Sequence, residues 1–145
     1  MAPLRIYLSG QFEDVTLLRR VRDDLTRHGF VITSRWLNDD SLEPATASAG
    51  EEGSTARLVS IASRDLENIE SADLVVVFNP DVARTIGRRG RHVETGYELA
   101  RAKPVILVGV RSNVLHWLPT VVVIDKWEEL IEKLREDRCT MLRRE

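Results

Sequence analysis

The chain of 145 residues is 43% hydrophobic, so it has the size of one domain and can bury a core of its own. Its 21 basic and 23 acidic side chains nearly balance, and this charge favours a small-molecule partner over a nucleic acid polymer. The single cysteine, Cys139, excludes an internal disulfide and a cysteine-rich metal site. No apolar stretch approaches the about 18 residues that span a membrane, and we expect a soluble, cytoplasmic protein without a metal or cofactor.

The beginning of the chain has the pattern of a strand, a helix and a second strand. Residues 4–9, "LRIYLS", are short and apolar and lead into a turn at Gly10, which is typical of a buried strand. The next segment has helical spacing, and Gly29 is placed to end the helix. Residues 30–33, "FVIT", predict the second strand. The apolar face of the helix comprises Val15, Leu18, Val21 and Leu25.

An acidic segment follows at residues 38–55, with five acidic side chains and no basic one. A loop of this length in a compact domain is either a functional lid or disordered, and the residues leave both open. Thr55 then caps a predicted helix that continues to Ala72. The apolar residues of this helix are Leu58, Ile61, Ala62, Leu66 and Ile69.

Three continuous apolar runs, at residues 73–78, 104–109 and 120–124, predict parallel strands covered on both faces. A closing helix is predicted over residues 126–136. The alternation predicts one α/β domain with a Rossmann-like (flavodoxin-like), doubly wound sheet of five mainly parallel strands and helices on both faces. In such a sheet the ligand lies at the carboxyl ends of the strands.

Three side chains near these strand ends are candidates for chemistry. Asp65 falls on the apolar stripe of its helix, where it is either a boundary residue bonded to a backbone amide or a carboxylate that points into the cleft. Glu94 lies in the first turns of a helix predicted over residues 90–102, a position that suits both helix capping and a nucleophile. Tyr7 is either an ordinary core tyrosine or a hydroxyl that orients a carboxylate.

Three motifs occur in order along the chain: "IYLSG", "RDLENIESADLVVVF" and "GRHVETGYELARAKPVILVG". Together they resemble the nucleoside 2-deoxyribosyltransferase superfamily, which includes the 2'-deoxynucleoside 5'-phosphate N-hydrolases and the cytidylate N-glycosidases. The resemblance covers roughly residues 4–118. It implies a Rossmann-like sheet, assembly into dimers or larger oligomers, and cleavage of an N-glycosidic bond by a glutamate nucleophile.

The resemblance assigns catalytic roles by position. The family glutamate lies nine residues before the Lys-Pro that opens the next strand, and this spacing selects Glu94. Asp65 matches an aspartate that binds the sugar or assists protonation of the leaving base, and Tyr7 matches the first-strand tyrosine. The implied mechanism is a double displacement in which Glu94 attacks C1' of the sugar while Tyr7 orients it. Glu98 is predicted to be a surface ion-pair partner of Arg101.

The substrate contacts implied by the resemblance include two departures from the family pattern. Arg88 replaces both the acidic residue of the free-nucleoside transferases and the phosphate-binding serine of the 5'-phosphate hydrolases, and a cation here favours a monophosphate. His116 aligns with a serine that the hydrolases contribute from a neighbouring subunit. Trp36 is either a base-stacking residue or a loop anchor. The expected substrate-binding residues are Ser9, Gly10, Gln11, Trp36, Arg88, Gly90, Arg91, His92, Asn113 and His116.

We therefore expect an enzyme that cleaves the N-glycosidic bond of a 2'-deoxynucleoside 5'-monophosphate or related nucleotide and releases the free base. Exchange of bases on free 2'-deoxynucleosides is the main alternative. A nucleotide phosphoribohydrolase of the lysine-decarboxylase-like group is disfavoured because its "PGGxGT" loop is absent. A non-catalytic nucleotide sensor is disfavoured because Tyr7, Asp65 and Glu94 occur together. The expected partners are a small nucleotide or nucleoside and further copies of the chain.

Overall fold

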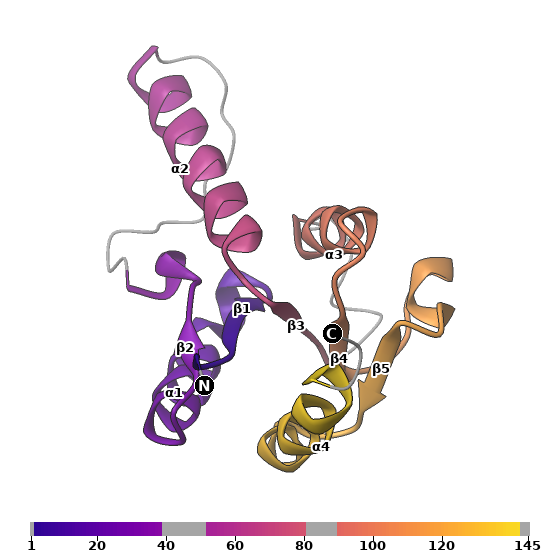
Figure 1. Cartoon of the computed structure of the whole chain (residues 1–145). Helices are drawn as coiled ribbons and strands as arrows, with labels where there is room; N and C mark the ends of the chain where they lie inside the picture. The colour runs from indigo at the N-terminus through magenta and orange to yellow at the C-terminus, as the bar shows by residue number, and fades with distance from the viewer. Residues whose placement is uncertain (1, 39–51, 81–89, 143–145) are drawn as a thin grey trace.

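The computed structural model describes residues 2–38, 52–80 and 90–142, which form a parallel sheet between two layers of helices (Figure 1). The strand order is β2-β1-β3-β4-β5, and every neighbouring pair is parallel. This order is that of flavodoxin-like sheets and confirms the predicted fold class. The strands are β1 (Arg5–Ser9), β2 (Val31–Ile32), β3 (Leu74–Asn79), β4 (Val105–Gly109) and β5 (Val121–Ile124).

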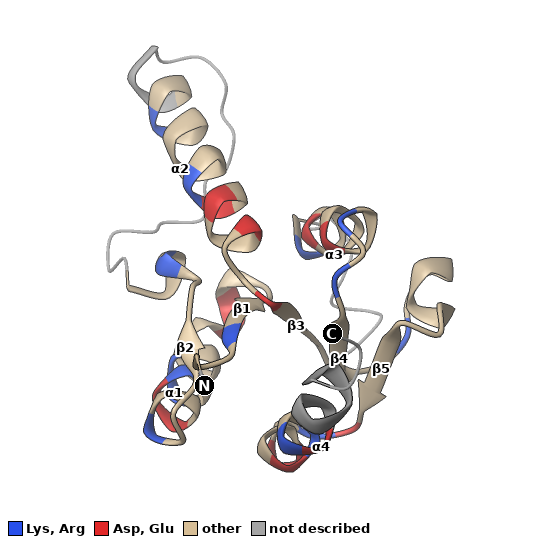
Figure 2. Ribbon diagram, in the orientation of Figure 1, with Lys and Arg blue, Asp and Glu red and all other residues tan. Residues whose placement is uncertain are grey.

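The helices cover both faces of the sheet, with α1 and α4 on one face and α2 and α3 on the other (Figure 1). Figure 2 shows that the charged residues are concentrated on these helices, whereas the strands are mainly uncharged. None of the helices within the described ranges is long and apolar enough to cross a membrane. The α-helices are α1 (Val15–Arg27), α2 (Glu52–Glu70), α3 (Gly90–Ala100) and α4 (Leu130–Leu142), and short 3-10 helices are η1 (Phe12–Asp14), η2 (Arg35–Asn38), η4 (Val114–Trp117) and η5 (Trp127–Glu129).

Two features of the connections differ from the prediction. Between β4 and β5 the chain forms only the short η4 and no α-helix, so the alternation of strands and helices stops there. The helix α2 begins at Glu52, and Thr55 lies inside it rather than at its cap. The rest of the predicted acidic loop, residues 39–51, lies outside the described residues.

The buried face of α2 is narrower than its apolar residues predict. Figure 1 shows the N-terminal half of α2 extending beyond the sheet. Ala62 and Leu66 are therefore exposed, and only Ile69 is fully buried. A half-buried line runs from Leu58 and Ile61 to Asp65, which places Asp65 on the inner face of the helix as the spacing predicts.

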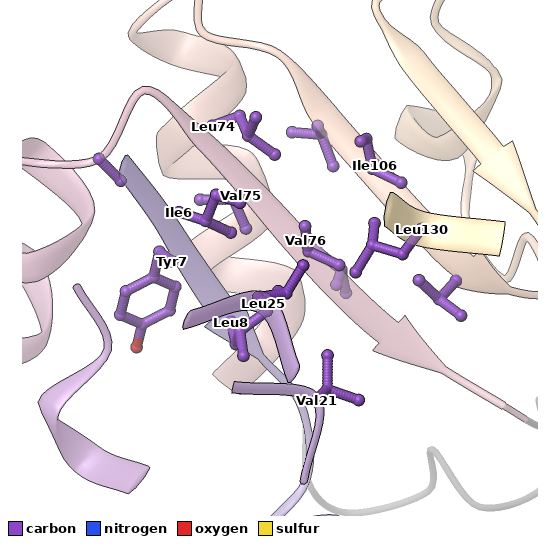
Figure 3. Packing of buried hydrophobic residues seen from close by; sticks show 14 of the residues in the cluster. Ile6, Tyr7, Leu8, Val21, Leu25, Leu74, Val75, Val76, Ile106 and Leu130 are labelled. Atoms are coloured by element: carbon purple, nitrogen blue, oxygen red, sulfur yellow. The ribbon is translucent and has the colours of Figure 1, made fainter. Parts of the chain in front are cut away.

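The core lies on both sides of the central strands β1, β3 and β4, whose apolar side chains are almost completely buried. Figure 3 shows Leu8 beside Val21 and Leu25 of α1, whereas the ring of Tyr7 points away from this cluster. Successive side chains of a strand point to opposite faces. Tyr7 and Ser9 therefore share the face of β1 that α2 and α3 cover.

The helix α1 ends at Gly29, as predicted. Gly29 has a φ of 87°, and its N–H donates to the carbonyl of Thr26 at 3.1 Å. The N–H of Phe30 donates to the carbonyl of Leu25 at 3.1 Å. These two bonds form a Schellman motif, in which glycine is favoured because it has no Cβ to strain the left-handed backbone.

The helix α3 ends in the same motif with alanine at the left-handed position. Ala102 has a φ of 57°, and its N–H donates to the carbonyl of Leu99 at 3.0 Å. The N–H of Lys103 donates to the carbonyl of Glu98 at 3.2 Å. Because an L-residue in this region is strained by its Cβ, Ala102 stores strain that Gly29 avoids.

Replacing Ala102 by glycine is expected to raise the free energy of unfolding by about 0.5–1 kcal/mol, because the relief of strain exceeds the extra freedom of glycine in the unfolded chain. The reverse change, Gly29→Ala, is expected to lower it by about 1 kcal/mol. Nothing lies within 4 Å of a Cβ built at Gly29, so the backbone strain would be the whole cost. Urea titration of both variants measures these changes, and an Ala102→Gly variant less stable than the parent would contradict the assignment.

Candidate active site

The order of the strands reverses between β1 and β3, so the crevice at the carboxyl ends of these strands is the expected ligand site. At this edge β1 ends at Ser9 and β3 ends at Asn79. The helices α2 and α3 contact each other on the face that Tyr7 and Ser9 share. Side chains from β1, α2 and α3 can therefore meet at one point.

Tyr7, Ser9 and Glu94 meet between β1 and α3. Tyr7 and Ser9 are fully buried, and both hydroxyls act on the carboxylate of Glu94. The hydroxyl oxygens of Tyr7 and Ser9 and the Oε2 of Glu94 are all buried. Within the described residues, none of these three atoms takes part in a hydrogen bond of ordinary geometry. The three groups are adjacent without forming hydrogen bonds of ordinary geometry. The two hydroxyls can therefore still donate, and the carboxylate can still accept, after a small movement of the side chains or to a ligand.

The environment of Glu94 controls its ionisation. Burial is the main cause that raises the pKa of Glu94 to about 7, and the negative charge of Asp65 adds to this rise. The hydroxyls of Tyr7 and Ser9 both oppose the rise. Burial, together with the charges of Glu94 and Asp65, raises the pKa of Tyr7 well above its ordinary value. Tyr7 is therefore a hydrogen-bond donor at neutral pH, and Glu94 is close to half ionised. A carboxyl group poised in this way suits nucleophilic catalysis.

Asp65 faces this group from α2 and is accompanied by a cation. Its Oδ1 lies 3.6 Å from Nη2 of Arg64. Burial raises the pKa of Asp65, and the charge of Arg64 opposes the rise. The sequence does not predict Arg64 as a site residue, because only the folded helix shows that its side chain turns back towards Asp65. The structure thus brings Tyr7, Asp65 and Glu94 together, while their catalytic roles stay predictions.

The carboxyl end of β1 is supported by side chains where β2 is too short to pair with it. The N–H of Leu8 donates to Oγ of Ser34 at 3.0 Å, and Nε1 of Trp36 donates to the carbonyl of Leu8 at 2.9 Å. Trp36 is only 9% exposed. This burial and hydrogen bond suit the role of a loop anchor, while base stacking by Trp36 stays a prediction.

Gly10 and Gln11, two further predicted substrate contacts, also have structural reasons for their positions. A Cβ at Gly10 would lie 2.7 Å from Cδ1 of Leu18, so glycine allows the end of β1 to pack closely on α1. Gln11 is buried, and its carbonyl accepts a hydrogen bond from the N–H of Asp14 at 3.0 Å. Both residues follow the carboxyl end of β1, and both shape the backbone that borders the crevice.

A buried arginine anchors the first turn of α3. Nε and Nη2 of Arg91 donate to Oδ1 of Asn79 at 3.1 and 3.0 Å. Nδ2 of Asn79 donates in turn to the carbonyl of Val110 at 2.6 Å and to Oγ of Ser112 at 3.0 Å. A Cβ at Gly109 would lie 2.1 Å from the carbonyl oxygen of Asn79, so only glycine allows β3 and β4 to approach this closely. Arg91 thus ties α3 to the ends of both strands.

His92, Asn113 and His116 form a polar cluster next to this anchor. Nδ2 of Asn113 lies 3.4 Å from Nδ1 of His92 and 3.3 Å from Nε2 of His116. Nδ1 of His116 accepts a hydrogen bond from the N–H of Ser112 at 2.9 Å. Burial lowers the pKa of His116, and the positive charges of Arg91 and Arg111 lower it further. The ring is therefore neutral at physiological pH, with its proton on Nε2.

This cluster lies on a different side of α3 from Glu94. His92 and Glu94 are two positions apart on the helix, a rotation of about 200°. Figure 1 shows α3 between α2 and the segment that contains η4. His116 is fully buried within its own chain, and its contact with a substrate stays a prediction. Arg88 lies outside the described residues, and Gly90 begins α3 with an exposed position.

The prediction that Glu98 is a surface ion-pair partner of Arg101 is wrong. Glu98 is fully buried instead of lying on the surface, and Nη2 of Arg101 pairs with Oε2 of Glu70 at 3.1 Å. Both carboxylate oxygens of Glu98 are buried, and no group of the described residues forms a hydrogen bond with them. Burial raises the pKa of Glu98 to about 7, although the charge of Lys103 opposes the rise. In the described parts of the chain, no three His, Cys, Asp or Glu side chains converge as metal ligands.

Comparison with solved structures shows which proteins share this fold. A 2-deoxyribosyltransferase from the psychrotolerant bacterium Bacillus psychrosaccharolyticus is 21% identical with a TM-score of 0.61, over 87% of this chain and 89% of that one. The CMP N-glycosidase BcmB of Clostridium botulinum is 20% identical with a TM-score of 0.55, over 90% and 98%. A conserved protein from Enterococcus faecalis V583 is 16% identical with a TM-score of 0.61, over 94% and 99%. No protein-family model and no curated protein sequence matches the chain.

The chain therefore has the fold of a 2-deoxyribosyltransferase and of a CMP N-glycosidase over nearly their full lengths. The fold that the resemblance of its three motifs implies is therefore confirmed.

Replacing Glu98 by glutamine is expected to weaken the pH dependence of stability. The folded chain binds a proton on Glu98 up to about pH 7, whereas the unfolded chain loses it near the ordinary pKa of about 4.3. Stability from this group is therefore present at low pH and is lost as the pH rises between these values. The parent is expected to lose about 1–3 kcal/mol more than Glu98→Gln between about pH 5 and pH 8.

Urea titrations of parent and variant at both pH values measure this difference. The slope with pH is the readout, because a buried glutamine amide has its own cost at every pH. Equal slopes would show that Glu98 is ionised or solvated in the folded chain.

Proposed function

We propose that the chain is an N-glycosidase that cleaves the N-glycosidic bond of a 2'-deoxynucleoside 5'-monophosphate, or a related nucleotide, and releases the free base. The observation that carries this proposal is the buried carboxyl group of Glu94, which adjoins the hydroxyls of Tyr7 and Ser9 and faces Asp65. Glycosidic bonds are broken by carboxylates in such paired settings. The shared fold with a deoxyribosyltransferase and a CMP N-glycosidase supports the same class of reaction.

The proposed reaction has two displacements at one carbon. In the first, an ionised oxygen of Glu94 forms a bond to C1' of the sugar as the bond from C1' to the base nitrogen breaks. The electron pair leaves with the base, which takes up a proton, and an ester joins the sugar to Glu94. In the second, water attacks C1' as the ester bond between C1' and Glu94 breaks. The attacking water loses a proton, the sugar departs with the hydroxyl group, and the carboxylate of Glu94 is regenerated.

Tyr7 and Asp65 have supporting roles in this proposal. The hydroxyl of Tyr7 stays protonated and donates to Glu94, so it favours the carboxylate and limits the directions in which that group can point. Asp65 is half-buried with a raised pKa, which suits a group that binds the sugar or passes a proton to the departing base. Arg64 limits the rise in that pKa and so favours the ionised form of Asp65.

A monophosphate is the proposed substrate because the sequence places cationic side chains directly before α3 and in its first turn. The sequence "GRRGR" leads into the first turn of α3, and the positive end of a helix favours a phosphate. The fold is shared with an enzyme named for its action on CMP. Base exchange on free 2'-deoxynucleosides is the second candidate, favoured by the deoxyribosyltransferase structure, which has a higher TM-score than the CMP N-glycosidase.

Incubation of the protein with paired 2'-deoxynucleosides and their 5'-monophosphates, each with and without a second free base, tests the proposal. Chromatography is expected to show base released from monophosphates, with little exchange when a second base is present. Base exchange on free nucleosides would contradict the proposed hydrolysis and support the deoxyribosyltransferase alternative. Binding without any turnover would favour a nucleotide sensor.

The change Glu94→Gln is expected to lower the turnover number at least about a thousandfold, because an amide cannot replace the attacking carboxylate. Glu98→Gln is the matched control: it removes a second buried glutamate of α3, one turn away, that takes no part in the reaction. That control is expected to keep its turnover number within about twofold. Full activity in Glu94→Gln would contradict the mechanism.

A further inference from the structure

Two hydroxyls of β1 lie on the same face of the strand, and the proposed reaction uses only one of them. Tyr7 and Ser9 are two positions apart, so the pleat of the strand directs both towards α3. Both side chains are fully buried. The Oγ of Ser9 makes no hydrogen bond of ordinary geometry with the described residues, although its hydroxyl acts on the carboxylate of Glu94. A buried hydroxyl without a partner is costly and calls for an account of what it binds.

The neighbouring group that can satisfy Ser9 is the carboxylate of Glu94. The Oε2 of Glu94 is likewise buried and has no partner among the described residues. A hydroxyl is a donor and an ionised carboxylate accepts several hydrogen bonds, so the two deficits are complementary. The backbone of Ser9 is held in register with Val77 of β3, and a rotation of the side chain alone would change the approach of its hydroxyl.

We propose that Ser9 is a positioning residue for the nucleophile, whose hydroxyl donates to the carboxylate of Glu94 together with that of Tyr7. Two donors from alternate positions of one strand then hold one carboxylate. This inference rests on the proposed function, because it assigns Ser9 a role in readying Glu94 for attack. It also revises the expectation that Ser9 contacts the substrate, since a fully buried side chain has little surface to offer a ligand.

The charges around Glu94 explain why a second donor matters. From α2, Asp65 faces Glu94 and its negative charge opposes ionisation, with Arg64 beside Asp65. From β1, Tyr7 is the titratable group, and it is protonated at neutral pH. On α3 itself, Arg91 and Glu98 lie one turn to either side, and Arg91 is bound to Asn79. Burial therefore disfavours the charged form of Glu94, and the hydroxyls of Tyr7 and Ser9 are what favour it.

Replacement of Ser9 by alanine is expected to move the acid limb of the turnover profile upward by about one pH unit, because the carboxylate loses one of its donors. The turnover number then falls about tenfold on the acid side of the limb and approaches that of the parent at higher pH. Tyr7→Phe should shift the limb in the same direction. Ser71→Ala is the control, since Oγ of Ser71 donates to the carbonyl of Asn68 at 3.1 Å and is remote from this group.

Titration of the ligand-free protein gives a readout that does not need turnover. Carbon-13 NMR of the glutamate carboxyl groups, with Glu94→Gln to identify the signal, is expected to show the Glu94 midpoint about one pH unit higher in Ser9→Ala than in the parent. This result stands or falls separately from the proposed reaction. An unmoved midpoint would overturn the inference: a raised KM would then make Ser9 a substrate contact, and a loss of stability alone would make it a packing residue.

Discussion

The structure of the candidate site depends on one constraint, the ionisation of a glutamate inside a protein. Burial raises the pKa of Glu94 to about 7, and a negative Asp65 on the facing helix adds to the difficulty. Donors from β1 oppose both effects, and they can do so because the strand order reverses beside β1 and leaves its carboxyl end open to α2 and α3. The topology, the pleat of β1 and the chemistry of Glu94 are therefore parts of one arrangement.

The position of α3 is the second requirement, because this helix carries Glu94. Its first turn is tied to β3 and β4 through the hydrogen bonds of Arg91 with Asn79. Its inner face buries Thr95 and Glu98 against the sheet. The glycine at position 109 allows the close approach of strands on which this anchor depends. A helix fixed at this many points can hold a carboxylate in one direction, which catalysis by positioning requires.

Much of the fold follows from short-range patterns, whereas the site depends on tertiary contacts. Continuous apolar runs predict β3 and β4 because both faces are buried, and Gly29 marks the end of α1 through its left-handed backbone. The resemblance to the superfamily selects Tyr7, Asp65 and Glu94, which the structure brings together. Sequence spacing fails for Glu98, whose spacing from Arg101 is that of a surface ion pair although packing buries it. It does not find Arg64, because that side chain matters only through the direction it takes in the fold.

The central claim is that Glu94 forms a covalent bond to the sugar. The most direct measurement is mass spectrometry of the protein quenched during turnover of a 2'-deoxynucleoside 5'-monophosphate, followed by digestion and peptide sequencing. We expect an added mass of one deoxyribosyl phosphate unit on the peptide that contains Glu94, and none in Glu94→Gln. An adduct on Asp65, or rapid base release by the parent without any adduct under conditions that trap the intermediate, would contradict it.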